Sequence, residues 1–360
     1  MGRRGAASTK VDSNCNQCSS ETGSETVVEA NAPGMEGVRA AQAEEVGSNR
    51  GRALITTKPF KQGEILLQEA PLLVTARKLA TIGGATHAKD FDVEYATKAY
   101  EALTTRQKGL LSGFSAGEGS LPLELAELVK AQPDLEQVVH FARVVRINAH
   151  VHPDGEKAGL YVLVARANHS CNPSCGLAST AGGQLLFYAL RDLEIGEEVD
   201  YSYLGGHFLL FQTPTRREQL LHTKLFECRC PRCGTSDGIN EASQQELVGE
   251  SPQDRVKAAL LAKLQVKVET LEASWSDPSK DVSKYISDWE NLAQQCGKLL
   301  GAQHHLYARA CFFSLQALTT GRCYRVGNVS DERYLKGISL FALPLVAYLK
   351  ACCPLGARRA

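Results

Sequence analysis

The stretch that decides the fold reads Asn168-His169-Ser170-Cys171-Asn172-Pro173, and Cys228-Arg229-Cys230-Pro231-Arg232-Cys233 follows later in the chain. Three thiols at C-x-C-x-x-C spacing can occupy three corners of a zinc tetrahedron, but a structural zinc site needs a fourth ligand. Cys171 and Cys175 are the natural donors. A zinc ion shared in this way would hold the Asn-His segment against the cysteines and fix polar groups in a pocket.

Three further motifs accompany these two. One is Gly196-Glu197-Glu198-Val199-Asp200-Tyr201-Ser202-Tyr203, and the others are Arg50-Gly51-Arg52-Ala53-Leu54 and the segment from Gly63-Glu64 to Pro71. At these residues the chain resembles the SET-domain protein lysine methyltransferases. Two further segments, Arg146-Ile147-Asn148-Ala149 and Gly159-Leu160-Tyr161, are similar to the SET-and-MYND branch. The resemblance covers roughly residues 48 to 236.

The resemblance implies an α+β protein with a β-rich SET fold, in which the Asn-His segment and the final tyrosine strand thread through one another as a pseudoknot. We expect a SET domain over 48–226 and a post-SET zinc knuckle over 227–236. Short β-rich runs predict strands within 54–75, 160–165, 185–190 and 195–203, with Gly182-Gly183 as a hairpin turn between the second and third of these runs. Helical spacing of apolar residues predicts a helical insert over about 77–146.

The two ends of the chain differ in composition. Residues 1–47 are rich in Gly, Ser and Glu and almost free of aromatic residues, so we expect them to be disordered. Cys15 and Cys18 lie there, but no longer run of Cys and His follows, so a MYND zinc finger is not predicted. Beyond residue 251, four apolar-periodic segments predict an all-α domain over 251–360, similar to the tetratricopeptide-type C-terminal domain of SET-and-MYND proteins.

Composition limits the classes of partner. The 360 residues carry 40 basic and 40 acidic side chains, which argues against direct nucleic-acid binding or an anionic membrane surface. The chain shows no signal peptide and no apolar run long enough for a membrane span. Its 12 cysteines therefore read as reduced thiols and metal ligands. We expect a monomer in the cytoplasm or nucleus whose partner is a protein presenting a lysine.

The resemblance also implies S-adenosylmethionine as the methyl donor. Asn168 and His169 match the family's Asn-His pair, and Gly51 allows the backbone a close approach to the cofactor. Phe226 matches an aromatic residue that stacks on adenine, although an ordinary core position is the alternative. The full cofactor set implied is Gly51, Arg52, Asn148, Asn168, His169, Tyr203 and Phe226.

Tyr203 matches the family tyrosine whose hydroxyl lies beside the transferring methyl group. A phenol there can accept a weak C–H···O contact and orient the acceptor amine. The alternative is an ordinary half-buried strand tyrosine. Tyr161 and Tyr201 either line the lysine channel or simply pack.

The family pattern makes Cys171 the fourth zinc ligand with Cys228, Cys230 and Cys233, and Cys175 is its rival. Two positions depart from the family pattern: Ser174 stands where an asparagine is usual, and Ala53 stands in place of a glycine.

Two other functions compete with methyl transfer. The first is a SET-like scaffold that has lost turnover and binds proteins through the helical C-terminal domain. The second is a zinc-dependent nucleic-acid regulator, which the neutral charge and the lack of a basic aromatic stripe disfavour.

Overall fold

The protein is described by a computed structural model, over residues 37–41, 52–117, 120–234, 252–274, 281–300 and 304–352. Gly51, the Cys15 and Cys18 pair, and most of the expected N-terminal tail lie outside these ranges. None of the helices within them is long and apolar enough to cross a lipid bilayer.

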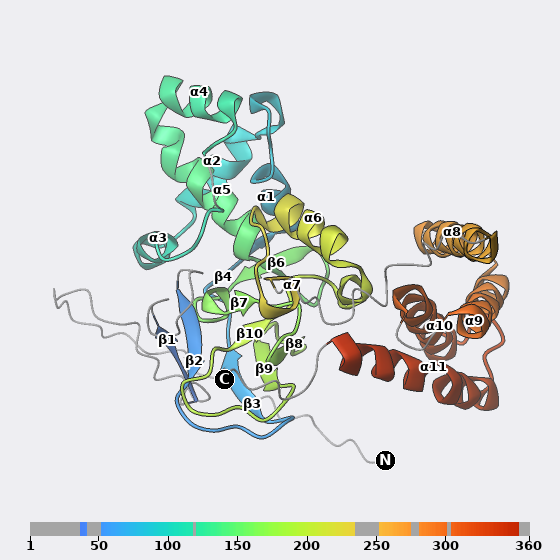
Figure 1. Cartoon of the computed structure of the whole chain (residues 1–360). Coiled ribbons are helices and arrows are strands. Elements are labelled where there is room, and N and C mark those ends of the chain that lie inside the picture. Colours follow the sequence, from blue (N-terminus) through green and yellow to red (C-terminus); the bar gives the residue numbers. More distant parts are fainter. Residues whose placement is uncertain are drawn as a thin grey trace, which may run out of the picture. The chain divides into compact units, whose positions relative to one another are not determined.

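The strands form several small sheets instead of one continuous sheet (Figure 1). In the first, β1 (Val38–Ala41) pairs antiparallel with β2 (Ala53–Thr56). In the second, β9 (Leu185–Ala189) lies between β3 (Ile65–Glu69) and β8 (Cys175–Ser179). In the third, β6 (Lys157–Leu160) lies between β4 (Leu73–Ala76) and β5 (His150–Val151).

The fourth sheet is the smallest and brings together the two most informative motifs. β7 (Asn168–His169) pairs in parallel with β10 (Asp200–Tyr201), so that Asn168 lies opposite Asp200 and His169 opposite Tyr201. The backbone N–H of Ser170 extends this pairing by donating to the carbonyl of Tyr201 at 3.1 Å. Two segments far apart in the sequence are thereby held side by side.

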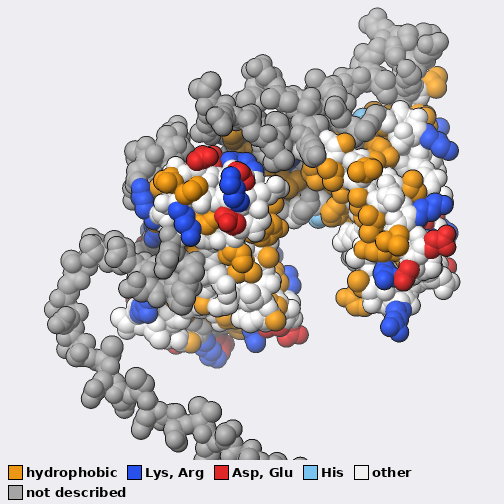
Figure 2. All heavy atoms as spheres, turned by 90° about the horizontal axis from the view of Figure 1, so that it is seen from below, with side chains coloured by type: hydrophobic (Ala, Val, Ile, Leu, Met, Phe, Trp, Pro, Cys, Tyr) orange, Lys and Arg blue, Asp and Glu red, His pale blue; other side chains and the backbone are white. Residues whose placement is uncertain are grey.

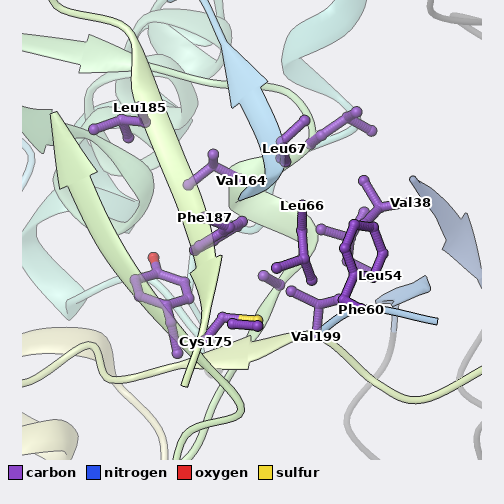
Figure 3. Packing of buried hydrophobic residues seen from close by; sticks show 14 of the residues in the cluster. Val38, Leu54, Phe60, Leu66, Leu67, Val164, Cys175, Leu185, Phe187 and Val199 are labelled. Carbon is purple, nitrogen blue, oxygen red and sulfur yellow. The ribbon is translucent and has the colours of Figure 1, made fainter. Parts of the chain in front are cut away.

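The sheets enclose a hydrophobic core, and strand β9 shows the alternation of inward and outward side chains that places residues in it. In β9, Leu185, Phe187 and Ala189 are buried while Tyr188 is exposed. Figure 3 shows Leu67 and Val164 in the cluster around Phe187. This core lies directly beneath the β7–β10 pair, since Tyr201 is part of it.

The predicted helical insert forms between β4 and β5. Its helices are α1 (Arg77–Ile82), α2 (Val93–Glu101), α3 (Thr105–Leu111), α4 (Leu123–Ala131) and α5 (Glu136–Asn148), with the short 3-10 turns η2 (Ala88–Asp90) and η3 (Pro133–Leu135). Thr104 and Gln107 form a capping box that starts α3. α5 buries an apolar face against the others, and its end delivers Asn148 and then His150 to the site.

The helices beyond residue 251 agree with the predicted all-α segment. They are α8 (Pro252–Ala273), α9 (Val282–Leu299), α10 (His305–Cys323) and α11 (Asp331–Cys352). Trp289 stacks on Phe313 at 4.9 Å between ring centroids and forms the centre of their core. α11 leaves apolar side chains exposed at Leu335, Leu340, Leu343 and Val346, and Figure 2 shows hydrophobic side chains gathered on the surface of these helices. The α+β class predicted from the sequence is confirmed.

Three local predictions were wrong. The strand expected over 160–165 ends at Leu160, and the chain turns into η4 (Val164–Arg166). The reason is Glu69, whose buried carboxylate accepts hydrogen bonds from the backbone N–H groups of Val162, Leu163 and Val164 at 2.7–3.0 Å and gathers them into a turn. The region 195–203 forms a strand only at Asp200–Tyr201.

The third wrong prediction concerns the hairpin at Gly182-Gly183. It joins β8 to β9, not the 160–165 run to β9, because β8 carries little strand signal of its own. The structure also differs from the expected disorder of residues 1–47 at Val38–Ala41, which form β1. Val38 and Ala41 are buried there against β2, which offsets the loss of chain entropy on ordering.

Candidate functional site

Four cysteines meet at one point in the structure. The sulfur atoms of Cys171, Cys228, Cys230 and Cys233 lie within 4.8 Å of one another, and all four side chains are buried. The Sγ atoms of Cys171 and Cys233 are 3.6 Å apart. A tetrahedron with zinc–sulfur bonds of 2.3 Å requires sulfur–sulfur distances of about 3.8 Å, so this donor set fits a zinc ion.

Cys175, the rival fourth ligand, lies elsewhere. Its side chain is buried in the hydrophobic core and stands among apolar residues in Figure 3. Burial raises the pKa of its thiol to about 12. The structure therefore groups Cys171, and not Cys175, with the C-x-C-x-x-C motif.

The cysteine cluster is surrounded by arginines that the sequence analysis did not identify. Arg216, on α6 (Thr213–Lys224), is fully buried and places its guanidinium 3.5 Å from the sulfur of Cys233. Burial alone would lower the pKa of Arg216, but the sulfurs of Cys171 and Cys233 raise it above its ordinary value. A permanent cation here offsets the negative charge that four thiolates bring to a zinc site.

Backbone contacts complete this outer layer. Arg217 donates to the carbonyl oxygens of Cys228 and Cys233, and Arg232 donates to that of Cys171 at 3.0 Å. The C-x-C-x-x-C turn, whose last residues form α7 (Pro231–Gly234), is thus fastened both to α6 and to the Asn-His segment.

Hydrogen bonds among the four thiols shift their pKa values in opposite directions. They raise the pKa of Cys171, and they lower the pKa of Cys233 well below its ordinary value and that of Cys230 to about 7. The thiolate is the form that binds metal, so metal binding would release protons from this cluster.

His169 connects the cysteine cluster to Tyr203. Its Nδ1 accepts a hydrogen bond from the backbone N–H of Tyr203 at 3.0 Å, and its Nε2 lies 3.2 Å from the sulfur of Cys171. Because Nδ1 accepts, the proton of a neutral ring resides on Nε2 and points at the sulfur. A histidine in this arrangement ties the position of Tyr203 to that of Cys171.

Asn168 is held by its own amide group. Its Nδ2 donates to the carboxylate of Glu198 at 2.8 Å and to the carbonyl of Arg52 at 3.2 Å. Both amide hydrogens are engaged, so Oδ1 is the atom oriented to accept a hydrogen bond from a ligand. Glu198, the second glutamate of the Gly-Glu-Glu motif, was not singled out in the sequence.

Tyr203 lies half-buried in a group of aromatic rings. Its ring centroid is 4.9 Å from that of Tyr201, 5.3 Å from His169 and 6.1 Å from Phe226. Its hydroxyl donates to the carbonyl of Ala167 at 2.8 Å. The phenolic oxygen is fixed by this bond, and its lone pairs can accept a weak contact from another group.

The two candidate channel tyrosines have different surroundings. Tyr201 is buried, packs on Tyr203, and has its hydroxyl 3.2 Å from Nε2 of His150. Tyr161 is also buried, but its hydroxyl donates to the carbonyl of Gly183, and its ring meets that of His150 in an edge-type contact at 5.9 Å between centroids. The structure thus brings Tyr201 into contact with Tyr203, whereas Tyr161 lies on the far side of His150.

The remaining predicted cofactor contacts surround this centre. The backbone of Arg52 meets Asn168, and its side chain is exposed. Asn148, the last residue of α5, donates its amide hydrogens to the carbonyl oxygens of Ser115 and Val144 at 2.6 and 2.8 Å. It therefore holds the end of α5 in place and keeps only its side-chain oxygen for a ligand.

Ser174, one of the two departures from the family pattern, forms hydrogen bonds to the backbone of β10 and its neighbours. Its hydroxyl accepts from the backbone N–H of Asp200 at 2.9 Å and donates to the carbonyl of Glu198 or Asp200 at 3.2 Å. Its own N–H donates to the carboxylate of Asp200 at 2.7 Å. The serine thereby fastens the end of the first motif to the β10 strand.

Residues 51–204, which include the paired strands β7 and β10, match the SET domain family. The chain is similar to the SET-and-MYND branch of that family. It is 28% identical over 219 residues to "Histone-lysine N-methyltransferase SMYD3" of Homo sapiens, which covers 59% of this chain and 45% of that protein. It is 35% identical over 101 residues to "Protein-lysine N-trimethyltransferase SMYD5" of Gallus gallus, covering 28% of this chain and 24% of that protein.

A fungal relative adds to this picture. The chain is 26% identical over 191 residues to "Histone-lysine N-methyltransferase set5" of Schizosaccharomyces pombe, covering 52% of this chain and 49% of that protein. The chain spans about half the length, or less, of these relatives.

Proposed function

We propose that this protein is an S-adenosylmethionine-dependent methyltransferase that transfers a methyl group to a lysine side chain of a protein substrate. One observation carries the proposal: the parallel pairing of β7 with β10 brings the Asn168–His169 segment beside Tyr203. The names of the related proteins, which describe lysine methyltransferases, support the same reaction.

The methyl donor supplies an activated methyl group on a positively charged sulfur. Asn168 and His169, together with Arg52, Asn148 and Phe226, are the residues we assign to binding it, and Tyr203 orients the reacting groups. Oδ1 of Asn168 would accept a hydrogen bond from the ammonium of the donor, since Glu198 holds the amide in that orientation. Phe226, half-buried beside His169, offers a ring face for the adenine.

The acceptor must arrive as a neutral amine, because an ammonium has no lone pair. A lysine in water has a pKa near 10.4, so the neutral form is scarce at pH 7. A buried channel disfavours the charged form and lowers that pKa. Tyr201 and Tyr203 provide an aromatic wall for the aliphatic part of the side chain, and the fixed Tyr203 oxygen orients the reacting groups.

Zinc would hold this arrangement together. We assign Cys171, Cys228, Cys230 and Cys233 as its ligands, with Arg216 as the compensating cation. Because His169 contacts both Cys171 and Tyr203, ligand loss would displace the tyrosine as well as the cysteine turn.

Calorimetry with S-adenosylmethionine tests the proposal on protein whose zinc content has been measured. We expect the wild type to bind with micromolar affinity and Asn168→Ala to abolish this binding. Asn172→Ala is the matched control, because Asn172 lies in the same motif, and it should preserve binding. Tritiated donor with core histones and purified ribosomal proteins as probes would then detect transfer, and Tyr203→Phe should reduce it at least 100-fold while binding changes little. Folded, zinc-loaded protein that fails to bind the donor would contradict the proposal.

The second candidate is a scaffold that acts through the helical C-terminal segment. The apolar side chains exposed along α11 favour it, among them Leu335 and Leu343, which are 62% and 72% exposed. Absence of donor binding would move this candidate to first place.

A further inference from the structure

A lysine that belongs to the protein itself lies against the tyrosine of the candidate site. Lys224, the last residue of α6, places its ammonium nitrogen 5.6 Å from the centre of the Tyr203 ring. The same nitrogen donates to the carbonyl oxygen of Ile147 at 2.6 Å. Its side chain is half-buried, and within the described residues no carboxylate forms an ion pair with it.

The groups around Lys224 do not neutralise its charge. Burial lowers the pKa of Lys224 to about 8, and the like charge of Arg146 on α5 contributes to this decrease. His150 on β5 is neutral near pH 7, because burial and the charge of Lys224 lower its pKa to about 4. Tyr201, whose hydroxyl faces His150, has a pKa raised well above its ordinary value.

Lys224 therefore places a positive charge beside the neighbouring aromatic rings of Tyr203 and Tyr201. We infer that Lys224 is a specificity-determining residue whose positive charge beside Tyr203 excludes a protonated acceptor amine and admits a neutral one. This inference rests on the proposed function, because that function places the transferred methyl group next to Tyr203. Lysine and arginine side chains that stay protonated are repelled, whereas a neutral amine is not.

An ordinary structural role for Lys224 would also explain part of the geometry. Ile147 lies in the last turn of α5, and a cation that binds a terminal carbonyl stabilises the end of a helix. That role concerns folding alone. It gives no reason for Lys224 to affect the binding of a charged ligand differently from that of a neutral one, and this difference can be measured.

The methyl donor and its demethylated product provide the two ligands. S-adenosylmethionine carries a sulfonium cation, and S-adenosylhomocysteine has a neutral thioether at the same position. A cation close to the reacting centre weakens binding of the first and leaves the second unaffected. The ratio of their dissociation constants, donor over product, therefore reports the charge of Lys224 without any need for turnover or for the protein substrate.

Calorimetry should be done with both ligands on the wild type, Lys224→Met and Lys224→Arg. We expect Lys224→Met to lower the donor-over-product ratio by roughly three- to tenfold, the range for two partly solvated unit charges several ångströms apart. Lys224→Arg keeps the charge and should keep the ratio. Lys58→Met is the matched control, since Lys58 also lies over an aromatic ring, that of Phe60, but is exposed.

The dependence on pH gives an independent arm. Between pH 7 and 9 the wild-type ratio should fall as Lys224 loses its proton, while the ratio of Lys224→Met stays constant and that of Lys224→Arg stays high. Lys224→Gln can still donate a hydrogen bond to Ile147, so it replaces Lys224→Met if that variant unfolds.

The outcomes separate the two proposals. An unchanged ratio in a folded Lys224→Met protein that binds both ligands overturns the role of Lys224 and leaves the proposed function standing. Failure of the wild type to bind either ligand removes the proposed function itself. Methylation of Lys224, detected by peptide mass spectrometry after incubation with the donor, would show that this lysine is an acceptor and would also overturn its role as a specificity-determining residue.

Discussion

Replacing Glu69 with glutamine should loosen the turn that leads into the Asn168–His169 segment. The two carboxylate oxygens of Glu69 accept four hydrogen bonds, from the N–H groups of Val162, Leu163 and Val164. A glutamine has nearly the same shape, but its NH₂ group can only donate. Whichever oxygen it replaces, two backbone N–H groups then face another donor in a buried position.

The size of the effect follows from those two lost bonds. A hydrogen bond to a charged group contributes about 1.5–3 kcal/mol, and a buried donor without a partner costs about 1–3 kcal/mol. Burial raises the pKa of Glu69 while the backbone N–H groups lower it, so part of the loss is offset by removing a desolvated carboxylate. We therefore expect a net local destabilisation of about 2–3 kcal/mol.

Hydrogen exchange followed by mass spectrometry is the suitable assay, because it reports local opening. Peptides covering residues 161–167 should exchange roughly 30-fold faster or more in Glu69→Gln, as 1.36 kcal/mol corresponds to a factor of ten. Glu64→Gln is the control: Glu64 accepts a backbone N–H from Lys61 at 2.7 Å, but in an exposed turn. If exchange in Glu69→Gln matched that of Glu64→Gln, the turn would not depend on the buried carboxylate.

Two further predictions concern the metal and acid stability. Cys171→Ser should lower zinc affinity by roughly 100-fold or more, while Cys175→Ser should keep zinc bound. Metal analysis after dialysis against a chelator distinguishes the two variants. Equal loss of zinc from both would refute the assignment of Cys171. The pKa of His150 is about 4 in the folded protein, below its value of 6.5 in the unfolded chain. Between these two pH values the unfolded state binds more protons than the folded state, so the stability of the fold decreases as the pH drops from 6.5 to 4. Denaturant titrations at both pH values measure the fall in the free energy of unfolding, and His150→Gln should reduce this fall by about 2 kcal/mol. His304 and His305, whose pKa values are also lowered by burial, should still contribute to the remaining fall. A fall in the variant as large as that of the wild type would show that His150 is not buried as described.

The parts of the site that could be predicted from the sequence were those encoded locally. The grouping of Cys228, Cys230 and Cys233 follows from spacing within one turn. Amphipathic periodicity was enough to predict the helices of the insert and of the C-terminal segment, but not α6. The β7–β10 pairing was expected only by resemblance, because the register of two strands of two residues each is determined by contacts distant in sequence. β8 escaped notice because Cys175-Gly-Leu-Ala-Ser lacks an alternating pattern, and its pairing with β9 determines its conformation.

Residues that act through long-range contacts left no local signal. Lys224 stands at the end of a polar helix, where a lysine ordinarily faces solvent and favours the helix dipole. Its position beside Tyr203 depends on how α6 packs on the end of α5, which one sequence does not reveal. Arg216 is similar: an arginine in a charged helix is usually exposed, whereas here it is fully buried against sulfur.

His169 explains why the Asn-His motif and the cysteine motif occur together in one chain. A buried histidine usually satisfies one polar neighbour, but both nitrogens of this ring are used, one by the backbone of Tyr203 and the other by the sulfur of Cys171. Neither a glutamine nor an asparagine reproduces a rigid ring with an acceptor and a donor on opposite sides. The distance between the cysteine cluster and the tyrosine is thus fixed by one imidazole, so the cluster belongs to the architecture of the site and not only to the stability of the fold.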